Sequence, residues 1–133
     1  MRKLLNLMAF ISLLFLFSCN ETTTQAPKGY DDFAHIEHWD ELSDLPDGNI
    51  IIYYYSPYCE VCQAMKEEVL EKLDQLEEDY VIYLISEGMI YEQGEPPFET
   101  KGVPALFIYN DGDYSEMLLG SKPVLEYLSS KLD

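Results

Sequence analysis

The amino-acid sequence predicts an α/β domain in which a mixed sheet has helices on both faces. Continuous β-branched and aromatic runs, typical of strands buried on both sides, alternate with segments of helical periodicity. The clearest runs are residues 50–55 and 81–85, and a β-hairpin signal and a last helical segment follow them. With 133 residues, 47% of them apolar, the chain has the length for one compact domain.

The first half of the domain is expected to contain two short elements and one strong strand. Residues 33–37 predict a short strand, residues 38–42 predict a short helix, and Asp47-Gly48 marks a turn. Residues 50–55 then form a central parallel strand, because a strand covered on both faces carries apolar side chains at successive positions.

A long amphipathic helix is predicted to follow this strand. Ser56-Pro57-Tyr58 ends the strand, and apolar residues then recur at steps of three and four. The opposite side of the predicted helix is rich in Asp and Glu, which we interpret as a solvated face. The residues of the apolar face are Val61, Met65, Val69, Leu73 and Leu76.

Residues 81–85 predict a second buried strand, and the segment after it is expected to be irregular. Residues 88–102 contain Gly94, Pro96 and Pro97, so any helix in this segment must be short. The sequence shows no internal repeat.

The C-terminal part predicts a hairpin and a helix. Residues 105–109 form a third strand, residues 110–113 (Asn-Asp-Gly-Asp) a tight turn, and residues 114–119 an antiparallel return strand. Ser121 is expected to cap the last helix, whose first turn tolerates Pro123. The apolar face of this helix consists of Val124, Leu125, Leu128 and Leu132.

The first 18 residues have the pattern of a signal peptide. Basic residues are followed by an apolar run over residues 4–17, which is shorter than the roughly 20 residues that a membrane-spanning helix needs. The run ends in Leu16-Phe17-Ser18-Cys19, which resembles the lipobox of bacterial lipoproteins, where the cysteine is lipidated and becomes the mature N-terminus. An ordinary secretory signal and an uncleaved anchor are the alternatives.

The chain therefore divides into three parts. Residues 1–18 are the predicted signal peptide, and residues 19–32 are polar and without periodicity, which predicts a flexible tether. Residues 33–133 are the predicted domain. The formal net charge of -17 makes a nucleic-acid partner unfavourable, because an acidic protein repels phosphates.

Two cysteines carry the clearest chemical signal. Cys59 and Cys62 lie where a buried strand changes to a helix, and free N–H groups at a helix N-terminus favour the ionised sulfur that attacks disulfides. Cys62, one turn later, lies on the same face and can attack a mixed disulfide formed at Cys59. Disulfides persist outside the cytoplasm, so an exported pair this close is expected to cycle.

Three features together resemble the thioredoxin family, over roughly residues 33–132. They are the strand-to-helix motif at residues 55–62, Gly102-Val103-Pro104 before a strand, and the final hairpin plus helix. The resemblance implies a thioredoxin-like fold in which Pro104 is cis and packs beside the two sulfurs. It also implies that Tyr58, Val103 and Pro104 contact a protein substrate.

The sequence departs from the family pattern at several positions. Tyr53 stands where thioredoxins commonly have a buried Asp that is taken to aid proton transfer, and Tyr83 stands near the place of the usual Lys. Between the cysteines Glu60-Val61 replaces the usual Gly-Pro, so membership of the thioredoxin subfamily itself does not follow. Proton transfer from Cys62 must then use water or another group.

The predicted function is that of an extracytoplasmic, lipid-anchored thiol–disulfide oxidoreductase with Cys59 as nucleophile and Cys62 as resolving thiol. Glu60 and Val61 offer no side-chain donor or cation to a neighbouring thiolate, which favours a reductase or isomerase over an oxidase. We expect a monomer without a cofactor, whose partners are protein thiols and disulfides and a membrane protein that keeps it reduced.

Two other functions compete with this prediction. The first is a non-catalytic surface lipoprotein or binding module in which a Cys59–Cys62 disulfide is structural. The second is a metal site formed by these cysteines with His35 and His38. Zinc-finger spacing is absent, and two histidines three positions apart diverge on a strand, so the prediction assigns no metal ligand.

Overall fold

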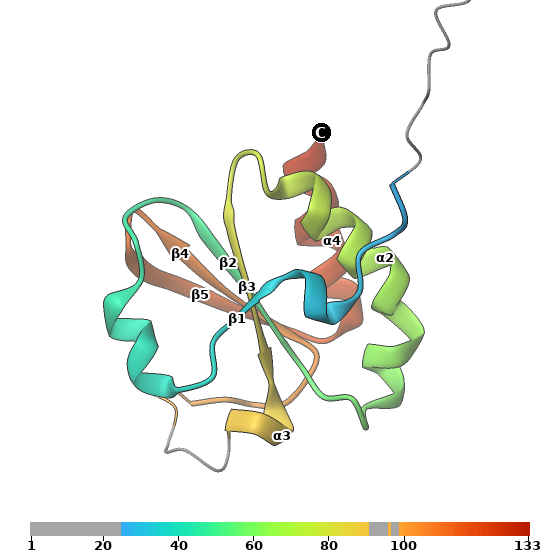
Figure 1. Ribbon diagram of the computed structural model, residues 1–133, viewed down its shortest axis with the longest axis horizontal. Helices are drawn as coiled ribbons and strands as arrows, with labels where there is room; N and C mark the ends of the chain where they lie inside the picture. Colours follow the sequence, from blue (N-terminus) through green and yellow to red (C-terminus); the bar gives the residue numbers. More distant parts are fainter. Residues whose placement is uncertain (1–24, 91–95, 97–98) are drawn as a thin grey trace, which may run out of the picture.

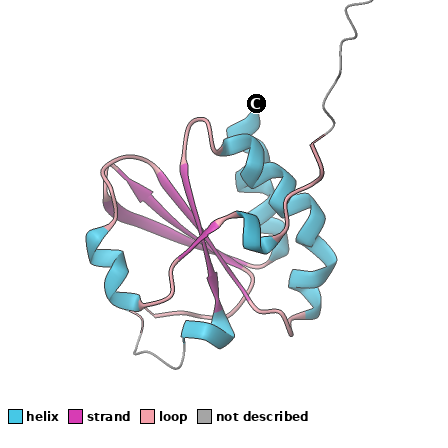
Figure 2. Ribbon diagram, viewed as in Figure 1, coloured by secondary structure: helices cyan, strands magenta, loops and turns pink. Residues whose placement is uncertain are grey.

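A five-stranded mixed sheet forms the centre of the molecule (Figures 1 and 2). The computed structural model describes residues 25–90, 96 and 99–133. The strand order is β1-β3-β2-β4-β5, in which β1, β3 and β2 run parallel and β4 and β5 are antiparallel to their neighbours. The strands are β1 (Ala34–His35), β2 (Ile50–Tyr55), β3 (Val81–Ser86), β4 (Ala105–Asn110) and β5 (Asp113–Leu119). The predicted mixed sheet is thus confirmed.

Helices cover both faces of this sheet, as predicted (Figure 1). One core lies under α2 and α4, and the other lies under η2 and α3. The helices are η1 (Tyr30–Asp32), η2 (Trp39–Asp44), α2 (Glu60–Leu76), α3 (Glu87–Ile90) and α4 (Ser121–Leu132), of which η1 and η2 are short 3-10 helices. None of the helices within the described ranges is long and apolar enough to cross a membrane.

The central strand β2 supplies both cores, which explains its continuous apolar sequence. All six of its residues are buried, and successive side chains point to opposite faces of the sheet. Ile51, Tyr53 and Tyr55 face α2 and α4, whereas the other three residues face η2 and α3. This alternation directs Tyr53 and Tyr55 towards the helix that begins at the cysteine pair.

Two local predictions were wrong at helix starts. Val61 is 48% exposed, because the buried stripe of α2 begins at Cys62 and the preceding residue is rotated towards solvent. Gly120, not Ser121, is the N-cap of α4. Gly120 has a φ of 96°, which favours glycine, and its carbonyl accepts the first helical hydrogen bond from the Val124 N–H.

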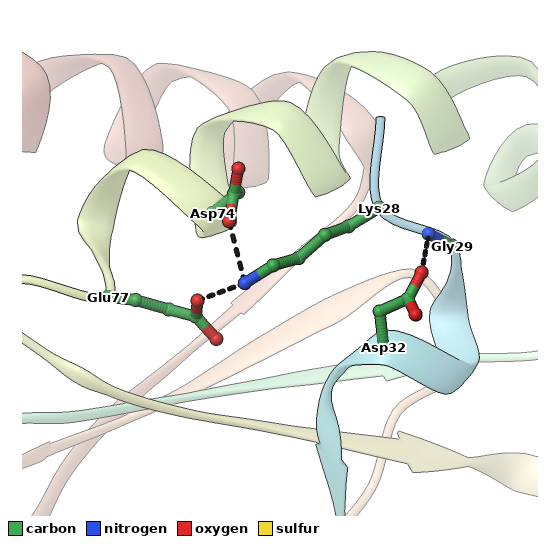
Figure 3. A network of polar contacts seen from close by, with 5 residues as sticks. All are labelled: Lys28, Gly29, Asp32, Asp74 and Glu77. Carbon is green, nitrogen blue, oxygen red and sulfur yellow. Dashed lines mark hydrogen bonds and ion pairs between the residues drawn. The ribbon is translucent and has the colours of Figure 1, made fainter. Parts of the chain in front are cut away.

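The N-terminal strap, which we define as residues 25–32, is packed against α2, although the sequence predicted a flexible tether up to residue 32. Figure 3 shows the Lys28 ammonium between the carboxylates of Asp74, at 2.7 Å, and Glu77. The same ammonium lies 4.9 Å from the centre of the Phe33 ring. The strap folds onto the domain because the acidic face of α2 provides two carboxylates for the single lysine of the strap. Residues 19–24, like the predicted signal peptide and Cys19, lie outside the described residues.

Replacement of Lys28 by Met should lower the free energy of unfolding by about 1 kcal/mol, since an ion-pair network is worth more than one exposed pair. The hydrogen bond to Asp74 is the largest cause of the raised pKa of Lys28. Urea denaturation at low and high salt measures the difference, which should shrink as salt screens it. Lys122→Met, at an 83% exposed side chain paired with Glu126, is the control and should change little. Equal effects of the two substitutions would contradict the role of the strap.

Candidate active site

A tight turn between β2 and α2 places Cys59 at the start of the helix. The Cys59 N–H donates to the Ser56 carbonyl at 3.2 Å, and the Tyr58 N–H donates to the Ser56 hydroxyl at 3.3 Å. Cys59 is the N-cap of α2, and its sulfur accepts a hydrogen bond of 3.1 Å from the Cys62 N–H. The helix N-terminus thus supplies a donor directly to this sulfur, which favours its ionised form.

The two sulfurs have different environments. Cys59 is half-buried, whereas Cys62 is completely buried, and neither forms a disulfide in this structure. Burial and hydrogen bonding to Cys59 raise the pKa of the Cys62 thiol to about 12. At neutral pH Cys62 therefore keeps its proton, and Cys59 is the sulfur that solvent and a substrate can reach.

The chain near Pro104 lies beside Cys59, although 44 residues separate Cys59 from Val103. The Val103–Pro104 peptide bond is cis, and the Cys59 sulfur lies 4.0 Å from the Val103 carbonyl oxygen. Pro104 is buried, and its own carbonyl accepts a hydrogen bond of 2.9 Å from Gly120. The structure therefore brings together three of the residues that the sequence singled out: Cys59, Val103 and Pro104.

Exposed apolar side chains lie next to these groups in the chain. Tyr58, directly before Cys59, is 90% exposed, and Val61 is also exposed. Glu60 is exposed too and carries the acidic charge of the first turn. The contact of Tyr58, Val103 and Pro104 with a substrate stays a prediction, but the exposure of Tyr58 leaves it free for such a contact.

Three stacked tyrosine rings belong to or pack against the core that contains Cys62. The centre of the Tyr55 ring lies 3.9 Å from the centre of the Tyr30 ring and 5.7 Å from the centre of the Tyr53 ring. Burial, and next the charge of Cys62, raise the pKa of Tyr30 to about 12, and the same two causes raise that of Tyr53 further. The sequence missed Tyr30, because a lone tyrosine in a polar segment gives no sign of where it packs.

The two histidines have separate surroundings. The His35 ring lies 3.0 Å from the Phe33 carbonyl oxygen through Nδ1 and 3.4 Å from the Tyr55 hydroxyl through Nε2. His38 is exposed before η2. Within the described ranges, no group of three or more His, Cys, Asp or Glu residues could hold a metal ion.

Comparison with known proteins gives a family match over most of the chain. The family model described as Thioredoxin matches residues 33–132, which include both cysteines and Pro104 but not the N-terminal strap. Curated proteins offer no match to the sequence.

Solved structures with similar folds include mitochondrial thioredoxin 3 from Saccharomyces cerevisiae in its oxidized form. That chain has a TM-score of 0.65 and 18% identity, and the match covers 80% of this chain and all (100%) of that one. A second match is a chain from a structure that describes the thiol resolving mechanism in yeast mitochondrial 1-Cys peroxiredoxin via glutathione/thioredoxin systems. It has a TM-score of 0.60 and 17% identity, and the match covers 80% of this chain and 100% of that one. A designed protein has a TM-score of 0.58 and 22% identity, and the match covers 76% of this chain and 94% of that one. At these identities the matches show the fold.

Alkylation should separate the two thiols. We expect iodoacetamide at neutral pH to modify Cys59 on the order of a hundredfold faster than Cys62, because the raised pKa of Cys62 keeps it protonated and Cys59 is the more accessible sulfur. Peptide mapping of the reduced protein measures both rates. In Cys59→Ser the remaining Cys62 should stay slow until the protein is unfolded with denaturant. Similar rates at the two folded thiols would reverse the assigned roles.

Proposed function

We propose, because this chain belongs to the thioredoxin family, that it is a thiol–disulfide oxidoreductase acting through Cys59 and Cys62. The observation that carries the proposal is the arrangement of the two sulfurs. A half-buried sulfur caps the helix, and a fully buried thiol lies one turn behind it. A purely structural pair has no need of one accessible sulfur at a helix N-terminus, whereas a nucleophile gains from that position.

The reaction proceeds in two exchange steps. The Cys59 thiolate attacks one sulfur of a substrate disulfide, a Cys59–substrate bond forms, and the released substrate thiolate takes a proton from solvent. Cys62 then loses its proton and attacks the Cys59 sulfur, which forms the Cys59–Cys62 disulfide and releases the second substrate thiol. The substrate gains two electrons and two protons, and the pair of cysteines is oxidised. A thiol donor of the membrane, as the partner, returns the pair to the reduced form.

We further propose that the protein acts as a reductase or isomerase. A strongly oxidising member of this fold needs extra stabilisation of its thiolate. Here the side chains between the cysteines are Glu60 and Val61, and the formal net charge of the chain is -17. Neither the neighbouring residues nor the overall charge supplies positive charge to the sulfur, so the reduced form is stabilised mainly by the helix N-terminus.

Equilibration with glutathione buffers tests the exchange and its direction together. We expect reversible formation of the Cys59–Cys62 disulfide at a potential near roughly -270 mV, closer to the reducing end of this fold than to the end near roughly -120 mV. Mass shifts after alkylation at each buffer ratio give the potential, with Cys59→Ser as the control that forms no internal disulfide. A potential above about -150 mV would make the protein an oxidase. A disulfide that fails to exchange would make the pair structural and favour a binding module.

The place of action that we propose is the extracytoplasmic side of a membrane. Its support is the signal-like segment ending in Leu16-Phe17-Ser18-Cys19. Lipidation at Cys19 would leave nine residues of chain up to Lys28, which spans at most about 30 Å. Since Lys28 is fixed to α2, the domain would stay close to the lipid surface, where a membrane redox partner can reach Cys59. We propose that it works there as a monomer.

Lipidation should be visible directly. The mature chain is expected to begin at an acylated Cys19 and to fractionate with membranes, since two acyl chains suffice for stable anchoring. Mass spectrometry of the N-terminal peptide and membrane fractionation measure this, with Cys19→Ser as the variant that should lose both properties. An unmodified Cys19 in a released, soluble form would contradict the anchor.

A further inference from the structure

Two buried phenol groups have no ordinary hydrogen-bond partner beside the redox pair. The hydroxyls of Tyr30 and Tyr53 are both enclosed and make no hydrogen bond within the described part of the chain. Burying a hydroxyl without a partner costs free energy, so such groups are uncommon in protein interiors. The burial of two such hydroxyls in one core therefore needs an explanation.

Stacking against Tyr55 holds the rings of Tyr30 and Tyr53 in place. Tyr55 lies between Tyr30 and Tyr53, and its own hydroxyl has partners in His35 and Ser86. The outer rings belong to the same core as Cys62. For both of them Cys62 is, after burial, the largest cause of the raised pKa, so this sulfur lies near both phenols although neither hydroxyl forms a hydrogen bond to it in this structure. The polar group that both phenols share is thus Cys62.

Tyr30 reaches this place through the N-terminal strap. Its ring is held between Tyr55 on one side and the Lys66 ammonium, 4.5 Å from the ring centre. The ion pairs of Lys28 fix the strap two residues earlier. Tyr30 lies before residue 33, where the family match begins, so the match does not include this contribution.

We propose that the hydroxyls of Tyr30 and Tyr53 donate hydrogen bonds to the Cys62 sulfur when it is ionised, and so assist its attack on the mixed disulfide at Cys59. They are positioning residues that act through Cys62. The inference rests on the proposed function and adds to it the groups that serve the second step.

The physical basis is the solvation of a buried charge. A neighbouring thiolate disfavours ionisation of a phenol, so the phenol stays neutral and keeps a hydroxyl hydrogen that it can donate to the thiolate. A buried thiolate otherwise lacks solvation, and a hydrogen bond to a charged group is worth more than one to a neutral group. In the thiol state the same hydroxyls are left without a good acceptor, which is the state that this structure shows.

The phenols are donors in this scheme and not bases. Their raised pKa values keep them protonated, so the proton of Cys62 leaves to water and finally protonates the departing substrate thiolate. Cys59, the N-cap of the same helix, is the titratable side chain that acts most on Cys62. Tyr55, Tyr80 and Tyr127 belong to or pack against the same core, and Lys66 lies over the Tyr30 ring. Neither carboxylates nor amines are among the causes of the Cys62 pKa shift.

Rapid mixing of the reduced protein with Ellman's reagent separates the two steps. Attack by Cys59 releases one coloured thiolate, and attack by Cys62 on the resulting mixed disulfide releases a second. We expect Tyr30→Phe and Tyr53→Phe each to slow the second phase about tenfold at neutral pH, with its pH midpoint raised by about one unit. The first phase should keep its rate. Both substitutions retain the ring, and thermal unfolding should show unchanged or greater stability because an unpaired hydroxyl is lost.

Tyr109→Phe is the matched control, because Tyr109 is equally a buried strand tyrosine but faces the opposite core. It should leave both phases unchanged. If the wild type shows two phases and the Tyr30 and Tyr53 variants keep its second-phase pH midpoint, the inference is wrong, even where their rates fall. If the wild type itself lacks the second phase, the proposed function fails instead. An effect of Tyr53→Phe alone would remove Tyr30 and the strap from the site.

Discussion

The junction between β2 and α2 holds one sulfur near the surface and the other in the core, and the chemistry of the site depends on this difference. Cys59 caps the helix and receives the Cys62 N–H, while the Cys62 side chain is fully buried. The junction is rigid because β2 is buried along its whole length and pairs with a strand on each side. A helix that started one residue later would place both sulfurs differently relative to solvent.

Burial of Cys62 creates an electrostatic problem that the surrounding residues must address. A thiolate in the core is costly, and the position that often carries a buried acid in this family holds Tyr53 instead. A phenol cannot compete for a proton as a carboxylate does, but it can donate a hydrogen bond to the ionised sulfur. In the mechanism that we propose, the tyrosine hydroxyls therefore stabilise the second thiolate as donors, and no buried base removes its proton.

The N-terminal strap connects the redox site with the proposed membrane anchor. Lys28 binds the acidic face of α2, and Tyr30 enters the core two residues later. We interpreted the acidic face of α2 from the sequence as a solvated surface, and in the structure it also fixes the strap. In a lipid-anchored protein the same contacts would limit how far the domain can move from the membrane and which surface it presents.

The sequence by itself determined the strands, the long helix, the mixed sheet and the cysteine pair, because each follows from local periodicity or from residue spacing. It also named Val103 and Pro104, but through a family resemblance and not through their chemistry. Only the tertiary structure decided that Val61 faces solvent, that Gly120 caps α4 and that Tyr30 packs against the core that contains Cys62. The physical reason is that these outcomes depend on contacts between distant segments. Lys28 and Asp74 are far apart in the chain, and no local pattern encodes their pairing.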